Sequence, residues 1–433
     1  MTLDLLDLIK SAARQCAHAA GAMRGLSPKS HTAGGRCASM AAFGALAAIS
    51  GLAHAQAVPR PGVAGGLPPA SKGSVTDLEP RANVLADPRW VTGSGTPVLG
   101  DDGQYHLFYD RIPRNNGRLF RGWLYVSQIA HATSPTPQGP YKFQDIALQS
   151  PGDDPTGRWD AVNAGNASCV RLPDPDSGGK LRYYLYFIAN RDTNNTFNDW
   201  YDHIINHRIG VAVADSPNGP WERRADPVCV PQSPLLGYVV NPAVTRLPGG
   251  KYLMVLKGRA ANQNLAAGSD TMGNYRTGWA LADKPTGPFT IQPSVILDTS
   301  GAAVEDPAAF MWNGVVYVAF KDARTTPSRV AWLYGTIGAD GHTITWTVPS
   351  ATDANYQISA RQLAWSDGTT TTLTSLERPF ILQDATGKPT HLTCIASVGD
   401  RLYKSPYPPT PLDPPPAIPT SSVTFNVCIP LLP

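Results

Sequence analysis

Two acidic residues stand shortly before prolines, and their carboxyl groups suit acid and base catalysis. Asp306 stands directly before Pro307, and Glu377 stands two residues before Pro379. Cleavage of a glycosidic bond needs one carboxyl group that protonates the leaving oxygen and a second carboxylate that activates water or attacks the sugar. Glu377 and Asp306 are therefore candidates for such a pair if the fold brings them together. The alternative stays open that each acid only caps a turn or pairs with Arg378.

The segments around these acids follow a repeating pattern. Five blocks each read as a β-hairpin, in which a strand ends at a Gly turn and returns as an apolar, aromatic-rich strand. They span 96–109, 166–188, 241–256, 306–320 and 378–395. The first three are followed by a second apolar strand that ends in a Pro-x-Gly-Pro-aromatic turn, at 137–141, 217–221 and 285–289. Two hairpins per unit make one blade, so the sequence predicts an all-β, five-bladed β-propeller with four antiparallel strands per blade.

Composition and length agree with this fold. Of the 433 residues only 16% are charged, while 40 are Gly and 41 are Pro, which favours short strands joined by turns. We expect a leader at 1–55, a linker at 56–80 and the propeller at 81–433. The last strand of the fifth unit is expected at 423–429.

The leader resembles a secretory signal. Arg36 precedes the small and apolar run 40–52, and Ala53-His54-Ala55 offers a small-residue cleavage site before Gln56. A membrane anchor is the alternative, but the apolar run is shorter than the roughly 20 residues that span a bilayer. The sequence therefore predicts a secreted or periplasmic protein. The start of translation is left open between Met1 and a later Met.

The formal net charge of the chain comes mostly from this leader. Five Lys or Arg residues against two Asp residues in 1–55 account for the formal net charge of +3. The remainder is near neutral, so we expect no nucleic-acid partner and, after removal of the leader, no membrane partner.

Four of the six cysteines lie outside the leader. An even number of cysteines in an oxidising compartment permits disulfides. Cys394 and Cys428 are expected on neighbouring strands of the fifth blade and are candidates for a bond. The four cysteines are Cys169, Cys229, Cys394 and Cys428.

The expected topology indicates which residues share the mouth of the pocket. In a propeller, the starts of the inner strands and the connections after the second strands lie on the same face, and long loops on a rigid scaffold commonly carry binding residues. Hydrogen-bonding groups and an aromatic face at such a mouth suit a carbohydrate. The substrate-binding candidates are Glu305, Asn241, Asn166, Arg378, Arg111, Trp159, His203, Lys257, Lys321 and Asp322. For Lys321 and Asp322, a surface ion pair is the alternative.

The sequence predicts no cofactor and no metal site. His203 and His207 stand four residues apart, but no third ligand follows at a recognisable spacing. A structural cation in the central channel is left open. No phosphate-binding Gly loop, Gly-x-Ser-x-Gly motif or CxxC pair is present.

These motifs resemble the five-bladed glycosidases of glycoside hydrolase family 43 and its relatives, families 32, 68, 117 and 130. The resemblance covers roughly 87–430. It rests on Asp306-Pro307, on Glu377-Arg378-Pro379 and on the Ser-Pro-Asn-Gly-Pro-Trp turn at 216–221. It implies a plant or algal oligosaccharide or polysaccharide as substrate and inversion at the anomeric carbon. It also implies that Glu377 is the general acid, while Asp306 orients the substrate or tunes the acid.

The chain departs from this family in its first blade. The family has its general base there, but the strand at 95–99 has no acid. Asp87 and Asp160 are the two candidates for this base, and Asp87 can also be read as a turn residue. Two other functions therefore stay open: a propeller that binds glycans without catalysis, and a glycoside phosphorylase that uses Arg and Lys at the mouth to bind phosphate.

Overall fold

The computed structural model describes eleven segments of the chain. All lie within one compact unit, Ile49–Pro433. The leader, the linker, Asp87 and the Pro-rich stretch 406–419 lie outside the described residues. The segments are 84–85, 90–113, 119–151, 157–191, 200–261, 273–300, 304–353, 357–359, 361–365, 369–398 and 423–431.

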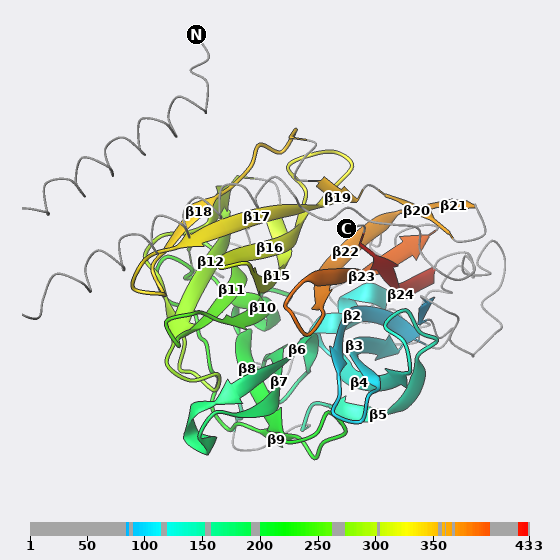
Figure 1. Cartoon of the computed structure of the whole chain (residues 1–433), viewed down its shortest axis with the longest axis horizontal. Coiled ribbons are helices and arrows are strands. Elements are labelled where there is room, and N and C mark those ends of the chain that lie inside the picture. The colour runs from blue at the N-terminus through cyan, green and yellow to red at the C-terminus, as the bar shows by residue number, and fades with distance from the viewer. Residues whose placement is uncertain are drawn as a thin grey trace, which may run out of the picture. The chain divides into compact units, whose positions relative to one another are not determined.

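The described strands form five antiparallel sheets of four or five strands, each of which is one blade of a propeller, and one separate two-stranded sheet. In Figure 1 the blades surround a common centre, and the first strand of each blade lies innermost. Blade I contains β2 (Trp90–Leu99), β3 (Tyr105–Pro113), β4 (Gln128–Ser134) and β5 (Lys142–Leu148). Blade II contains β6 (Gly165–Asp174), β7 (Lys180–Ala189), β8 (Arg208–Ala214) and β9 (Glu222–Arg223).

The next two blades each carry a short fifth strand. Blade III contains β10 (Val239–Arg246), β11 (Tyr252–Arg259), β12 (Tyr275–Ala282), β13 (Thr290–Ile291) and β14 (Leu297–Thr299). Blade IV contains β15 (Val304–Trp312), β16 (Val315–Asp322), β17 (Arg329–Ile337), β18 (Ile344–Thr347) and β19 (Gln357–Ser359). Outside the blades lie β20 (Gln362–Ala364), β21 (Thr370–Thr372), η2 (Leu119–Leu124), η3 (Pro175–Ser177) and α3 (Trp200–Ile205).

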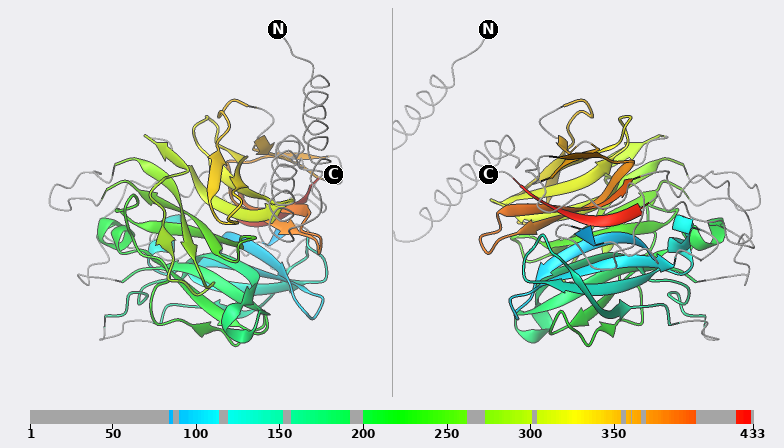
Figure 2. Two further views of the ribbon diagram at one scale, coloured as in Figure 1. Left: turned by 60° about the vertical axis from the view of Figure 1, so that its left-hand side comes forward. Right: turned by 90° about the vertical axis from the view of Figure 1, so that its right-hand side faces the viewer.

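Blade V closes the ring with both ends of the described chain. It contains β22 (Ser375–Gln383), β23 (Pro389–Val398), β24 (Val423–Pro430) and β1 (Val84–Leu85). Its outermost strand therefore comes from the N-terminal side and pairs with the last strand, with Val84 opposite Val427. Figure 2 shows β24, in red, beside the blue strands of blade I. Between these blades the amide of Thr92 donates to the Thr424 hydroxyl, 3.0 Å away.

The middle strands of the blades read as continuous apolar runs because both of their faces are covered. In β7 all seven residues 183–189 are buried, and in β11 all eight residues are buried. Each such strand lies between two neighbouring blades, so the alternation of a half-exposed strand is lost. The prediction of an all-β, five-bladed propeller with four main strands per blade is confirmed.

The cysteines correct one prediction. Cys394 and Cys428 do lie on neighbouring strands, but Cys394 is opposite Val427 and Cys428 is opposite Thr393. The offset of one residue places the two side chains on opposite faces of the sheet. All four cysteines of the described chain are buried and free, so the candidate bond between Cys394 and Cys428 is not formed.

The described residues contain no helix that is long and apolar enough to cross a membrane.

Candidate active site

Each inner strand contains a β-bulge at the same level of the propeller. The pairing with the second strand is interrupted after Gly93, Gly165, Val240, Glu305 and Glu377. In blades II to V the first skipped residue has a positive φ: 53° at Asn166, 57° at Asn241, 60° at Asp306 and 52° at Arg378. A bulge turns the skipped side chain out of the ladder. The repeat thus delivers one polar side chain to the channel from each of these four blades.

The sequence explains why the strands break here. Pro242, Pro307 and Pro379 follow the positive-φ residue directly. Proline has no N–H to give to a ladder, so it favours a bulge over regular pairing. Asn and Asp adopt the left-handed conformation more readily than other residues, whereas Arg does so rarely. The conformation of Arg378 is therefore held by its surroundings.

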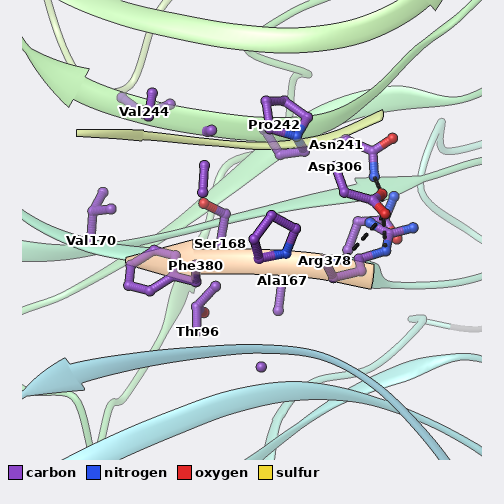
Figure 3. A pocket seen from close by; sticks show the side chains of 17 residues that line it. Thr96, Ala167, Ser168, Val170, Asn241, Pro242, Val244, Asp306, Arg378 and Phe380 are labelled. Carbon is purple, nitrogen blue, oxygen red and sulfur yellow. Dashed lines mark hydrogen bonds and ion pairs between the residues drawn. The ribbon is translucent and has the colours of Figure 1, made fainter. Parts of the chain in front are cut away.

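Asp306 is the centre of one cluster at this level. Its Oδ1 accepts a hydrogen bond of 2.8 Å from Asn241 Nδ2 and lies 3.3 Å from Arg378 Nε. Its Oδ2 accepts a bond of 3.2 Å from the Arg378 backbone N–H. Figure 3 shows these three side chains together at one end of the pocket that the inner strands line. Burial raises the pKa of Asp306, although the Arg378 guanidinium opposes this effect.

Glu305, Lys257, Lys321 and Glu377 form a second cluster beside the first. Lys321 Nζ lies 2.8 Å from a carboxylate oxygen of Glu305 and 2.8 Å from one of Glu377. Lys257 from blade III pairs with the other oxygen of Glu305. Burial disfavours the charge of Glu305, but the two lysines outweigh it and lower its pKa. Burial likewise opposes the charge of each lysine, and Glu305 raises both of their pKa values.

The strand register explains this second cluster. Lys321 is directly opposite Glu305 in blade IV, and Lys257 is opposite Val240 at the same level of blade III. Seven of the predicted site residues therefore meet at one end of the channel, and they come from three consecutive blades. They are Asn241, Lys257, Glu305, Asp306, Lys321, Glu377 and Arg378.

Asp110 is an acid at the same level of blade I that the sequence reasoning missed. It is opposite Gly93 in the register, the position that Lys257 and Lys321 hold in their blades. Its oxygens accept bonds of 2.8 Å from the Asn166 backbone N–H and 3.2 Å from that of Ala167. The sequence does contain a signal for Asp110. It follows the apolar part of the second strand of its blade, as Lys257 and Lys321 do in their blades.

Asp160 and Trp159 lie away from this cluster. The buried Asp160 carboxylate accepts bonds of 2.9 Å from Arg158 and 2.9 Å from Arg223, which belongs to the outermost strand of blade II. The Trp159 ring stacks on Phe187, with 5.9 Å between the centroids, and its Nε1 donates to a backbone carbonyl. Both residues therefore hold blade II together at its outer side, and the structure does not bring Asp160 to Glu377.

Arg111 and Asp322 are also engaged elsewhere. The Arg111 guanidinium lies 4.0 Å from the centroid of the Trp90 ring and 4.7 Å from that of Phe143, on the outermost strand of blade I. Asp322 forms a two-pronged ion pair with Arg324, with contacts of 2.7 and 2.9 Å. Neither has a described contact to the carboxylates of the cluster.

His203 belongs to a buried network, whereas Asn166 lines the channel. His203 Nδ1 lies 2.8 Å from Asn190 Oδ1, inside a buried network that also contains His207. Burial lowers the pKa of His207 to about 3. Asn166 does line the channel, as predicted. Among the described residues, no group of three or more His, Cys, Asp or Glu side chains is arranged to hold a metal ion.

Comparison with known proteins shows a similarity of fold. No protein-family model matches the chain, and no curated protein matches it in sequence. The solved structure of BT0996 in a complex with RGII is 12% identical with a TM-score of 0.51, and the match covers 81% of this chain and 91% of that one. The solved structures that match also include glycoside hydrolases of families 43, 62 and 117.

Two of these structures have a stated source. Zg3597, a family 117 glycoside hydrolase of the marine bacterium Zobellia galactanivorans, is 16% identical with a TM-score of 0.48, over 84% of this chain and 90% of that one. The catalytic domain of the Coprinopsis cinerea GH62 α-L-arabinofuranosidase is 11% identical with a TM-score of 0.49, over 86% and 98%. At these identities the similarity concerns the fold, and the function has to be argued from the site.

Proposed function

We propose that this chain is a glycoside hydrolase that cleaves a glycosidic bond in a plant or algal oligosaccharide or polysaccharide. One observation carries the proposal: Glu377 and Asp306 lie at the same level of adjacent inner strands, where the backbone N–H of Arg378, the residue after Glu377, donates to Asp306. Cleavage of this bond needs a general acid at the leaving oxygen, and a second buried carboxyl group beside it can position and tune that acid. The solved structure of BT0996 in a complex with RGII has a similar fold, which supports a polysaccharide as the substrate class.

The two acids receive different roles in this proposal. Glu377 protonates the leaving oxygen, and its side chain is 10% exposed, which allows contact with a bound sugar. Asp306 has a side chain only 4% exposed and fixes Arg378 and Asn241 around the channel. We assign Asp306 the positioning of these groups and the tuning of the acid. Asp87 stays a candidate for the base and lies between β1 and β2 in the sequence.

The reaction is proposed to invert the anomeric carbon. Inverting glycosidases activate a water molecule with the base, whereas retaining enzymes form a covalent intermediate with a nucleophile. Proton NMR of the first product formed from a defined oligosaccharide distinguishes the two outcomes. A product that keeps the configuration of the substrate contradicts the inverting mechanism.

Activity on a panel of polysaccharides tests the proposal. Arabinan, xylan, levan and agarose represent the sugars that propellers of this kind could accommodate, and release of reducing ends is the measurement. We expect Glu377→Gln to lower kcat by about 100-fold or more on any substrate that the wild type cleaves. Glu222→Gln is the matched control, since Glu222 is exposed on the outermost strand of blade II.

Other outcomes select the alternative functions. Binding of a glycan without turnover identifies a carbohydrate-binding propeller. Turnover that requires inorganic phosphate identifies a phosphorylase. Full activity of Glu377→Gln and Asp306→Asn contradicts the proposed site.

We also propose that the protein is secreted or periplasmic. The run 40–52 and the following Ala53-His54-Ala55 support this location. N-terminal sequencing of the protein from a culture tests it, with Gln56 as the expected first residue. An intact N-terminus in the cytoplasmic fraction contradicts the proposal.

A further inference from the structure

Lys321 bridges two carboxylates of different blades. Its Nζ lies 2.8 Å from Glu305 Oε1 and 2.8 Å from Glu377 Oε1. Only 11% of its side chain is exposed. An ammonium group has three donors, and these two contacts use two of them. Lys321 therefore has less capacity to bind a sugar than its place at the mouth suggested.

The Lys321 bridge joins Glu377, the candidate general acid, to Glu305. Glu305 is opposite Lys321 in the same sheet, whereas Glu377 belongs to β22 of the next blade. Across its own sheet Glu377 is opposite Ile395. Glu305 is fixed a second time by Lys257. The series Lys257, Glu305, Lys321, Glu377 thus runs from blade III to blade V.

We propose that Lys321 is a positioning residue that holds Glu377 in its working orientation and separates its charge from that of Glu305. This inference rests on the proposed function, because it gives a role to the acid assigned there. It assigns Lys321 to the catalytic group and no longer to the substrate.

The physical reason is the burial of the four charges. Without the ammonium of Lys321, the carboxylates of Glu305 and Glu377 face each other in a site from which water is largely excluded. Two like charges that face each other repel, and this repulsion opposes the ionised form of either carboxyl group. Glu377 also loses one contact that orients it, and a misplacement of about 1 Å can cost roughly 100-fold in rate.

Lys257 provides a matched control. It carries the same charge, lies at the same level of the preceding blade and has a side chain that is also 11% exposed. Its described ion pair is with Glu305, not with Glu377. Lys257→Met therefore removes an equal charge from Glu305 while the Lys321 bridge remains.

The experiment follows the Glu377 carboxyl group directly and needs no substrate. The protein is labelled with ¹³C at the glutamate side-chain carboxyl, and the Glu377 signal is identified by its loss in Glu377→Gln. We expect the chemical shift of this signal at neutral pH to change in Lys321→Met and in Lys321→Gln, to return toward the wild-type value in Lys321→Arg, and to stay in place in Lys257→Met. If Lys321→Met does not fold, Lys321→Gln gives the same comparison.

Kinetics on the substrate found by the panel separate this inference from the proposed function. We expect kcat of Lys321→Met to fall by about 100-fold with KM changed less than about threefold, because the residue acts on the acid and not on the sugar. A Glu377 signal with the same chemical shift in wild type and Lys321→Met overturns the inference, whatever the activity. A moved signal in a protein that cleaves no glycoside keeps the electrostatic role of Lys321 and overturns the proposed function.

Discussion

The backbone N–H of Arg378 donates a hydrogen bond of 3.2 Å to Oδ2 of Asp306, so the bulge of blade V is fixed by the bulge residue of blade IV. A similar relationship occurs on the other side of the channel, where Asp110 of blade I accepts the N–H of Asn166 in blade II. Acids at this level therefore hold the neighbouring blade as well as offering chemistry. Their effects on stability and on activity have to be measured together.

Asp306→Ala should destabilise the protein and abolish its activity. The substitution leaves Arg378 and the Asn241 amide without their shared acceptor, and removing one member of a buried pair costs about 3 kcal/mol. Asp306→Asn keeps one acceptor and tolerates the positive φ, so we expect a smaller loss of stability. Urea unfolding measures both variants. An Asp306→Ala protein as stable as the wild type contradicts the proposed role of Asp306 in fixing the two bulges.

Glu305 should make the stability depend on pH in the acidic range. Burial opposes its charge, but Lys257 and Lys321 hold its pKa below the usual 4.5. The folded state therefore binds fewer protons than the unfolded state, and Glu305 stabilises the fold above pH 4.5. This stabilisation is lost as the pH falls below that value. We expect the difference in unfolding free energy between wild type and Glu305→Gln to be largest at neutral pH and to shrink in acid.

The sequence predicted the fold well because the signals of a propeller are local. Each Gly turn and each apolar return strand can be recognised without knowledge of its neighbours. Five such copies in the same order indicate one architecture, the five-bladed propeller. The pairing of β1 with β24 was not readable, because a strand of two residues carries no pattern of its own. The register of β23 and β24 was equally hidden, and with it the separation of Cys394 from Cys428.

The sequence predicted the candidate site only in part, because it does not show which contacts the long side chains make. Topology alone placed Lys257 and Lys321 at the mouth, but their ion pairs with Glu305 and Glu377 depend on the register of two blades. Asp160 looked free in the sequence, although Arg223, more than 60 residues later, neutralises it.

Asp160→Asn should destabilise the protein while leaving the catalytic steps unchanged. Asp160 is fully buried between Arg158 and Arg223, so its loss leaves the Arg223 guanidinium poorly compensated, at a cost of about 3 kcal/mol. Thermal unfolding and the pH dependence of kcat/KM are the measurements. We expect a lower Tm and an unaltered pH profile. Loss of activity with normal stability would restore Asp160 as the general base.

The four cysteines of the described chain should be free thiols in the purified protein. Alkylation with iodoacetamide in denaturant, without reductant, should modify all four, as counted by mass spectrometry. Cys394 and Cys428 are the decisive pair, because their side chains point to opposite faces of the sheet. A disulfide-linked peptide that contains both residues contradicts the register of β23 and β24.

Asp110→Ala should cost more stability than a surface acid of the same blade. The Asp110 carboxylate accepts two backbone hydrogen bonds at the bulge of blade II, and bonds to a charged group contribute about 1.5–3 kcal/mol. Asp101→Ala is the control, because Asp101 is mostly exposed and pairs with Arg171 at the surface. Urea unfolding should separate the two variants by at least about 1 kcal/mol. Equal stabilities would show that the carboxylate of Asp110 does not hold Asn166, and would leave it available as the acid that the first blade otherwise lacks.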